Sequence, residues 1–291
     1  MDPRKQNLSR YATHHLQFNP GQDLSLLNAM IYTIIEEGLI DEDYVKNNTE
    51  GFELLEKEIK SFNPQIMEKI CGINSEIIRE VARLYAKSKT SIIFWGMGIS
   101  QHVHGTQNAL CLINLALITG QVGRDGTGLH PLRGQNNVQG ASDAGLIPMS
   151  YPDYQRVDVN KNLSEMESFW NATLDPNEGK TVVEIIEDIY SNKIKGLYVQ
   201  GENPAMSDPD QNHARKALAK LEHLVVQDIF MTETAWHADV ILPASAHAEK
   251  NGTYTNTNRQ VQLGRAVVKT PENVKQDWWI IQEIAKRMGL D

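Results

Sequence analysis

Cysteine is scarce in this chain, since only Cys71 and Cys111 occur among 291 residues. They lie far apart and without CxxC spacing, so the chain alone offers no disulfide framework and no cysteine-based zinc or iron-sulfur site. We expect both thiols to be buried as small apolar side chains in a reducing compartment. The nine histidines show neither HExxH nor facial-triad spacing, so they predict no metal site.

Long apolar runs and a surplus of basic residues are also missing. No segment approaches the roughly 20 apolar residues that a membrane-spanning helix needs, and the N-terminus has no apolar signal core. These absences predict a cytoplasmic protein that does not insert into a membrane. Because 28 Lys and Arg stand against 37 Asp and Glu, the formal net charge is -9, which argues against nucleic acid as a partner.

The motifs of common nucleotide sites and hydrolases are absent. Gly96 and Gly98 supply only the first two glycines of a GxGxxG fingerprint, and no GK[ST] phosphate loop occurs. Neither GxSxG nor a pattern of paired carboxylates marks a hydrolase. An ordinary NAD or ATP site is therefore not supported, and a tight strand-to-helix turn explains the two glycines better.

What the chain does have is an alternation of helical and strand patterns. Helices are predicted at 23–37, 42–48, 51–60, 64–70, 75–87, 108–120, 181–192, 211–220, 232–237 and 276–289. Strands are predicted at 91–95, 196–201, 223–228 and 239–243. Because these strands are apolar on both faces, they suit parallel sheets covered by helices. We predict an α/β protein of two three-layer αβα domains with mainly parallel sheets, residues 1–135 and 136–291.

Polar loops follow all four predicted strands, at 96–101, 201–204, 227–228 and 243–245. Ligands of parallel α/β sheets lie beyond the carboxyl ends of the strands, so we expect these loops to meet at one sheet edge. Each loop alone is weak evidence, because Asn203-Pro204 is also typical of a turn and Asp228 of a helix cap.

Three charged residues are candidates for direct contact with a ligand. A carboxylate such as Asp23 can accept from the adjacent N1–H and N2–H2 donors of guanine, although capping the helix that it begins is an equally good interpretation. Arg4 fits a phosphate or base clamp, or a solvated terminal residue. Arg133, in the amide-rich loop PLRGQNNVQG, presents a planar charged fork that suits an anion anchor, while bonds to loop carbonyls explain it equally well.

Several long stretches resemble the molybdopterin oxidoreductases, and among them the catalytic (alpha) subunits of formate dehydrogenases. The stretches are DPRK (2–5), NPGQDLSLLNAM (19–30), IIEEGLIDEDYV (34–45), WGMGISQ (95–101), TGQVGRDGTGLHPLRGQNNVQG (119–140), GENP (201–204), VVQDIFMTETAWHADVILP (225–243) and DWWIIQEIAKRMG (277–289). Nitrate reductases look similar before the LRGQNN run but lack it, which makes formate the leading substrate.

The resemblance implies a molybdenum or tungsten centre held by two pyranopterin guanine dinucleotides (bis-MGD), which oxidises formate to CO2. Electrons would pass to iron-sulfur clusters and to an iron-sulfur or NAD-linked electron-transfer subunit. Position by position, Arg133 matches the arginine that orients formate, and Gln135 a glutamine near the pterin. Residues that match positions around one dinucleotide are Arg4, Gly21 and Asp23, and those that match the glycine loop beside the cofactor are Met97, Gly98 and Gln101. Those that match the region of the other dinucleotide are Gly201, Asn203, Ser207, Gln227, Asp228, Thr232 and Asp239.

The sequence also departs from this family. The cysteine-rich segment that holds a 4Fe-4S cluster, and the metal-ligating cysteine or selenocysteine followed by histidine, are not in this chain. We therefore expect a central fragment of a larger enzyme that does not turn over formate alone, whether or not it binds cofactor. The alternatives are a non-catalytic guanine-nucleotide-binding or scaffold domain of the same fold, or another molybdopterin oxidoreductase such as a nitrate reductase.

Overall fold

The structure is a computed structural model that describes residues 1–290. The chain divides into two compact units, unit 1 (Met1–Gly134) and unit 2 (from Gln135 onward). The predicted domain boundary between 135 and 136 lies next to this division. No helix in the described part of the chain is long and apolar enough to cross a membrane.

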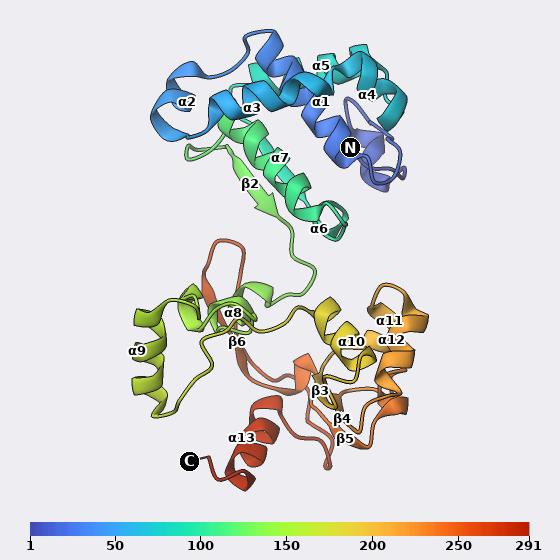
Figure 1. The fold of residues 1–291 in the computed structure, drawn as a ribbon, viewed down its shortest axis with the longest axis vertical. Coiled ribbons are helices and arrows are strands. Elements are labelled where there is room, and N and C mark those ends of the chain that lie inside the picture. The colour runs from blue at the N-terminus through green and yellow to red at the C-terminus, as the bar shows by residue number, and fades with distance from the viewer. Residues whose placement is uncertain (291) are drawn as a thin grey trace. The chain divides into compact units, whose positions relative to one another are not determined.

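Unit 1 is mainly helical (Figure 1). Its elements are η1 (Asn7–Tyr11), α1 (Asp23–Glu36), α2 (Glu42–Asn48), α3 (Phe52–Glu58), η2 (Ile59–Phe62), α4 (Pro64–Cys71), α5 (Ser75–Lys87), β1 (Ile92–Trp95), α6 (Met97–Ser100), α7 (Gly105–Ile118) and β2 (Gly128–Pro131). Apolar residues of α1 such as Leu27, Ile31 and Ile34 are almost fully buried, which makes α1 the centre of the core, with α4, α5 and α7 packed around it.

Local polar contacts define where these helices begin and how they pack. The side chains of Asn63 and Asn74 accept backbone N–H groups at the starts of α4 and α5, as preferred N-cap residues do. Arg79 and Arg83 on α5 bind Glu37 after the end of α1, with 2.7 Å from Arg83 Nε to the carboxylate. The hydrogen bond from Arg83 is the main reason that the pKa of Glu37 is lowered.

The sheet of unit 1 has two parallel strands, β1 and β2, with Ile92 opposite Gly128. Side chains alternate along β1, so Ile93 and Trp95 pack on the helical core while Phe94 is exposed. The carboxyl end of β1 leads directly into the turn at Gly96 and the short helix α6.

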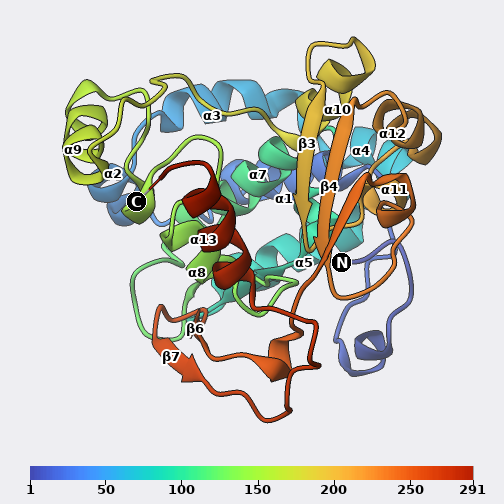
Figure 2. The same cartoon turned by 90° about the horizontal axis from the view of Figure 1, so that it is seen from below.

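Unit 2 contains a three-stranded parallel sheet and a separate hairpin (Figure 2). Its elements are α8 (Val138–Asp143), η3 (Pro152–Tyr154), α9 (Asn160–Trp170), α10 (Val182–Tyr190), β3 (Gly196–Gln200), α11 (Pro204–Ser207), α12 (Gln211–Leu218), β4 (His223–Asp228), η4 (Ala235–His237), β5 (Val240–Pro243), η5 (His247–Glu249), β6 (Gly252–Thr255), β7 (Val261–Gly264) and α13 (Asp277–Arg287).

The order β3-β4-β5 places the last residues of the three strands side by side, with Gln200 opposite Gln227 and Gln227 opposite Leu242. On one face of this sheet, Val199 and Val226 pack against Leu218 of α12. The polar residues at the strand ends therefore share one edge, and the apolar cluster beneath holds them in place.

The predicted fold class is confirmed, because the strands of both main sheets are parallel and helices lie between them in the chain. The expectation that four strand-end loops meet at one edge is wrong in one respect. The loop at 96–101 follows β1 of the unit 1 sheet, whereas the other three follow strands of the unit 2 sheet. The helix predicted at 232–237 is a single 3-10 turn, η4, and α8, α9, β2, β6 and β7 were not predicted.

Both cysteines are buried, as predicted from their scarcity and spacing. Cys71 lies in the core of unit 1, and the Cys111 thiol donates to the side-chain oxygen of Asn28 at 3.3 Å. Burial raises the pKa of the Cys111 thiol to about 11, so it stays protonated near neutral pH. Within residues 1–290, no group of three or more His, Cys, Asp or Glu residues could hold a metal ion.

Candidate functional site

Unit 1 has a cleft of about 580 Å³ at the carboxyl end of β1. The N-terminal segment, the start of α1, β1 and the α6 turn each contribute to its walls. The lining residues include Met1, Asp2, Pro3, Phe18, Pro20, Gly21, Asp23, Trp95, Gly96, Gly98, Ile99, His102 and Leu132. Three of the predicted cofactor residues, Gly21, Asp23 and Gly98, are thus brought together in one cleft.

Asp23 is the buried charged group of this cleft, with 6% of its surface exposed. No Lys or Arg side chain in the described part of the chain lies within ion-pair distance of it, and it makes no side-chain cap with another residue of α1. Burial raises the pKa of its carboxyl, and its own backbone N–H and the nearby His102 offset part of this rise. This carboxylate accepts only from its own backbone N–H, so further acceptor positions on its two oxygens remain for donors of a ligand.

The backbone beside Asp23 leaves room for a ligand. Gly21 has φ +79°, a conformation that favours glycine, and a Cβ at this position would meet nothing within 4 Å. Gly98, which also lines this cleft, has open space where a Cβ would stand. Polar backbone at both glycines can therefore be approached closely from the cleft.

The remaining predicted residues of unit 1 are exposed. Arg4, Met97 and Gln101 are not within the cleft lining, and the Arg4 backbone N–H donates to Asp2 at 2.7 Å. Arg133 is exposed as well, and its guanidinium makes no hydrogen bond or ion pair to any described residue. No bond from Arg133 to a loop carbonyl is thus present among the described residues, and its charged fork remains available to an anion. Gln135 begins unit 2 and is also exposed.

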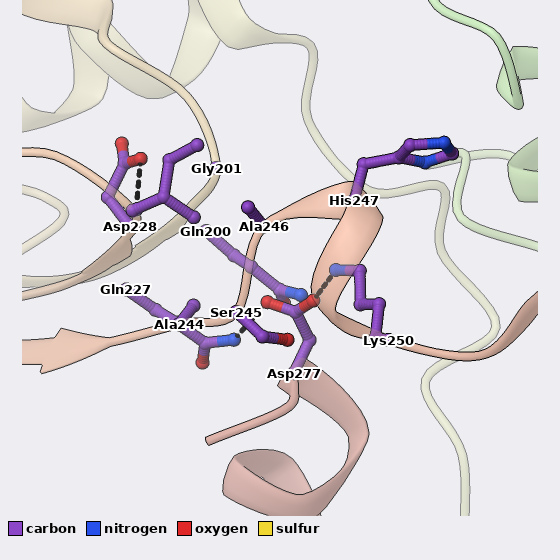
Figure 3. A pocket seen from close by; sticks show the side chains of 11 residues that line it. Gln200, Gly201, Gln227, Asp228, Ala244, Ser245, Ala246, His247, Lys250 and Asp277 are labelled. Atoms are coloured by element: carbon purple, nitrogen blue, oxygen red, sulfur yellow. Dashed lines mark hydrogen bonds and ion pairs between the residues drawn. The ribbon is translucent and has the colours of Figure 1, made fainter. Parts of the chain in front are cut away.

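Unit 2 has a second cleft, of about 300 Å³, at the carboxyl ends of β3, β4 and β5 (Figure 3). The loops after all three strands and the first residue of α13 line it. The lining residues are Gln200, Gly201, Gln227, Asp228, Ile229, Ala244, Ser245, Ala246, His247, Lys250 and Asp277. Gly201, Gln227 and Asp228, predicted from sequence, meet here as expected for one edge of a parallel sheet.

A chain of hydrogen bonds joins three residues of this cleft to Tyr198, which lies outside its lining. The hydroxyl of Tyr198 bonds the side-chain oxygen of Gln227, and Gln227 Nε2 donates to Asp277 Oδ1 at 2.7 Å. The ammonium of Lys250 binds the other oxygen of Asp277, as the dashed line in Figure 3 shows. We call these four residues the Tyr198 array, and they join β3, β4, α13 and the segment after η5.

Ser245 has the one side-chain oxygen among the residues of this cleft that is buried without a partner. Only 2% of the residue is exposed, and its backbone N–H is already bonded to Lys275 at 2.9 Å. A buried hydroxyl without a partner is costly, so a polar ligand group within reach of Ser245 would remove that cost.

The side chains of Asn203 and its neighbours bond to one another beside the cleft and do not line it. The side-chain oxygen of Asn203 accepts from the backbone N–H and the hydroxyl of Thr234, and its amide donates to Glu233 at 2.7 Å. Ser207 bonds Glu202, and Thr232 accepts from the backbone of Ala235. The turn expected at Asn203-Pro204 is instead the start of a helix, since Asn203 is the N-cap position of α11 and Pro204 is its first residue.

Asp228 and Asp239 lie at opposite edges of the sheet. Asp228 ends β4 and accepts from its neighbour Ile229 at 2.6 Å, within the cleft lining. Asp239 precedes β5, and its carboxylate accepts the backbone N–H of Leu224 at the start of β4, at 2.7 Å. The structure therefore does not bring Asp239 to the cleft with the other predicted residues.

Ser245, Lys250 and Asp277 are among the cleft residues that were not singled out as ligand contacts from the sequence. Ser245 stood in a recognised strand-end loop, but nothing in the sequence distinguished its hydroxyl from an exposed one. Asp277 lies in the first turn of the helix predicted at 276–289, and only the packing of α13 brings that helix start to the edge of the sheet.

Comparison with known proteins identifies the family of this chain. The family profile of "Molybdopterin oxidoreductase" matches residues 1–287. The chain is 48% identical to the F420-dependent formate dehydrogenase subunit alpha of Methanocaldococcus jannaschii, covering 99% of this chain and 42% of that protein. It is 40% identical to formate dehydrogenase H of Escherichia coli, covering 99% of this chain and 40% of that protein.

A solved structure supports the fold. Acetylene hydratase from Pelobacter acetylenicus superposes with a TM-score of 0.75 at 23% identity, over 99% of this chain and 42% of that one. The chain thus spans about two fifths of the length of the relatives that it matches. Since the family profile extends over nearly all of its residues, this chain belongs to the molybdopterin oxidoreductase family.

Proposed function

We propose that this chain is the central part of a formate dehydrogenase catalytic subunit, in which it binds two guanine dinucleotides of the molybdopterin cofactor and helps to orient formate. Alpha subunits of formate dehydrogenases at 40–48% identity support the activity. The observation that carries the binding role is Asp23, a buried carboxylate without a cationic partner at the floor of a cleft.

The unit 1 cleft suits a guanine base. Guanine offers two adjacent donors, N1–H and N2–H2, which the two oxygens of one carboxylate accept together. Such a pair would add two donors to the backbone N–H that Asp23 already accepts. The open backbone at Gly21 allows close approach, and the ring of Trp95 supplies an apolar wall.

The unit 2 cleft suits the second dinucleotide. Ser245 lacks a partner, and Asp228 uses only a local backbone donor, so both can bond to ribose or base groups. Lys250 and Asp277 place a charge pair beside them. A cleft of about 300 Å³ is within the range of ligand pockets and fits part of a dinucleotide rather than all of it.

The redox centre itself would come from the bound molybdopterin, which supplies the two-electron chemistry of formate oxidation. The protein ligand of molybdenum or tungsten would come from outside this chain, because both of its cysteines are buried and neither lines a cleft described above. This chain would contribute the anion anchor. Arg133 is exposed and unpaired, and its fork matches the two oxygens of a carboxylate such as formate.

The electron acceptor belongs to the same proposal. An iron-sulfur or NAD-linked subunit is the expectation from the resemblance. Relatives named F420-dependent, at 48%, 41% and 40% identity, favour a partner subunit that passes electrons to F420. Formate-dependent reduction of F420 or of NAD by the full-length protein with its partner subunits would decide between these acceptors.

A switch of base specificity tests the guanine site. Titration calorimetry of the 291-residue chain should show binding of GDP, and Asp23→Asn should lose the unit 1 contribution. The same variant should gain affinity for xanthosine diphosphate, because the Asn amide donates to xanthine O2 and its oxygen accepts from N1–H. Asp43→Asn, at an exposed position of α2, is the control and should keep the preference for GDP. Equal affinity of the wild type for GDP and ADP would refute the guanine assignment.

A further inference from the structure

We propose that Tyr198 is a positioning residue of the unit 2 cleft, which acts through Gln227 to hold the Asp277 carboxylate in the orientation that accepts donor groups of the bound dinucleotide. This inference rests on the proposed function of that cleft. Tyr198 itself is not in the cleft lining, so it has no direct contact with a ligand there.

The donor and acceptor roles in the Tyr198 array follow from chemistry. An ionised Asp277 carboxylate only accepts, so the NH2 group of Gln227 must face it. The carbonyl oxygen of Gln227 then faces Tyr198, whose hydroxyl must donate. Burial, and next the charge of Asp277, raise the pKa of Tyr198, so this hydroxyl keeps its proton at neutral pH. The array has one possible polarity, from Tyr198 toward Asp277.

Burial makes the orientation of Gln227 depend on both partners. Its exposed fraction is 0%, and it lies on the central strand between β3 and β5. Without the Tyr198 hydroxyl, its oxygen would be a buried acceptor with no partner, and the amide could gain by rotating away from Asp277. Tyr198 is partly exposed on β3, so its phenol can lose the hydroxyl without leaving a large cavity.

Two donors from different elements fix the Asp277 carboxylate. Gln227 holds Oδ1 and Lys250 holds Oδ2, which leaves one lone pair on each oxygen for other donors. Ser245, with no partner for its hydroxyl, lines the same cleft. The cleft thus combines a carboxylate fixed by two donors with a hydroxyl that lacks a bond, an arrangement that suits the hydroxyl and N–H donors of a nucleoside.

The first test compares Tyr198→Phe with the wild-type chain in GDP titrations. Because the variant removes one hydrogen bond behind the ligand contact, GDP affinity of the unit 2 cleft should fall roughly threefold to tenfold. Tyr190→Phe is the matched control, since its hydroxyl makes no side-chain hydrogen bond and its ring lies on α10. If the wild type binds GDP in unit 2 and Tyr198→Phe binds it equally well, the positioning role is wrong.

The second test uses pH to separate positioning from general support of the fold. Gln227→Glu places a carboxylate against Asp277, so GDP should bind weakly at pH 8 and recover near pH 5, where a shared proton restores the donor. The other titratable groups that face Gln227 or line the cleft are unchanged in this variant, so the pH profile of the wild type corrects for their titration. These groups are Tyr198, Lys250, Asp277, Asp228 and His247. If the GDP affinity of the variant changes with pH in the same way as that of the wild type, the inference is wrong.

A third measurement needs no ligand. Thermal unfolding of Tyr198→Phe, Asp277→Asn and the double variant gives the coupling between two residues that share no hydrogen bond with each other. If the shift in melting temperature of the double variant differs from the sum of the two single shifts, the result supports an effect transmitted through Gln227. Additive shifts contradict such an effect. If the wild type binds no GDP in unit 2, the proposed function of that cleft fails, and the coupling still decides whether Tyr198 orients Asp277.

Discussion

Gly105 lies so close to Ser100 that a Cβ on Gly105 would stand 1.9 Å from the Ser100 carbonyl oxygen. This approach folds the end of α6 back onto the start of α7 and fixes the turn that carries Met97 and Gly98. Gly105→Ala should therefore destabilise the chain by roughly 1–3 kcal/mol, because the backbone must move. Urea unfolding measures this change, with Gly98→Ala as the comparison.

Gly98 has open space and a helical position, so alanine there should leave stability unchanged or slightly higher. Equal destabilisation by both substitutions would show that the contact between Gly105 and Ser100 does not restrict the turn.

Asp23 should make the unliganded chain less stable at neutral pH. Burial raises the pKa of its carboxyl above the ordinary value of 3.8, so between 3.8 and that higher pKa the folded chain binds more protons than the unfolded one. Stability from this group is therefore lost as pH rises through that window. Asp23→Asn should melt at a higher temperature than wild type at pH 7, and the difference should narrow toward pH 4. A lower melting temperature at pH 7 would contradict this account.

Ser245→Ala should separate stability from binding. Loss of a buried hydroxyl without a partner should leave the unliganded chain equally stable or up to about 1 kcal/mol more stable. GDP affinity of the unit 2 cleft should fall roughly threefold to tenfold if a ligand group bonds to that oxygen. Calorimetry and thermal melts measure both effects on one preparation. Ser164→Ala, at an exposed position of α9, should leave GDP affinity as it is.

Arg133→Lys should impair formate oxidation in a full-length subunit with its cofactor loaded. Lysine keeps the charge but loses the two-pronged geometry, so KM for formate should rise and kcat should fall. We expect kcat/KM to drop on the order of tenfold, which corresponds to about 1.4 kcal/mol. Steady-state kinetics at matched cofactor content measure this change, and Arg10→Lys is an exposed control in the same unit. Unchanged kinetics would show that Arg133 does not anchor the substrate.

Much of the fold was predictable because apolar spacing and capping residues are local. The pattern at 75–87 gave α5 with the same bounds, and the strand predicted at 223–228 is β4. The hairpin β6–β7 was missed although GTYT and VQLG are separated by a polar turn, because its strands are too short to alternate clearly. Strand order was not predictable, since the partner of β1 is decided by tertiary packing.

Only the part of the candidate site that lies at the ends of strands was predicted from the sequence. Gly201, Gln227 and Asp228 met because parallel strands end at a common edge. Asp239 was expected with them, but it stands at the start of its strand and not at the end. Asp277 and Lys250 come from segments whose approach to this edge depends on how α13 packs, which no local pattern records.

The three side-chain hydrogen bonds of Asn203 have a consequence for how a ligand enters the unit 2 cleft. They tie the turn after β3 to Glu233 and Thr234 before any ligand arrives. Ligand binding then loses little conformational entropy from this loop, because the loop is already ordered. The cleft is thus pre-organised on the side of Gly201, and most of the conformational entropy lost on binding is that of the nucleotide.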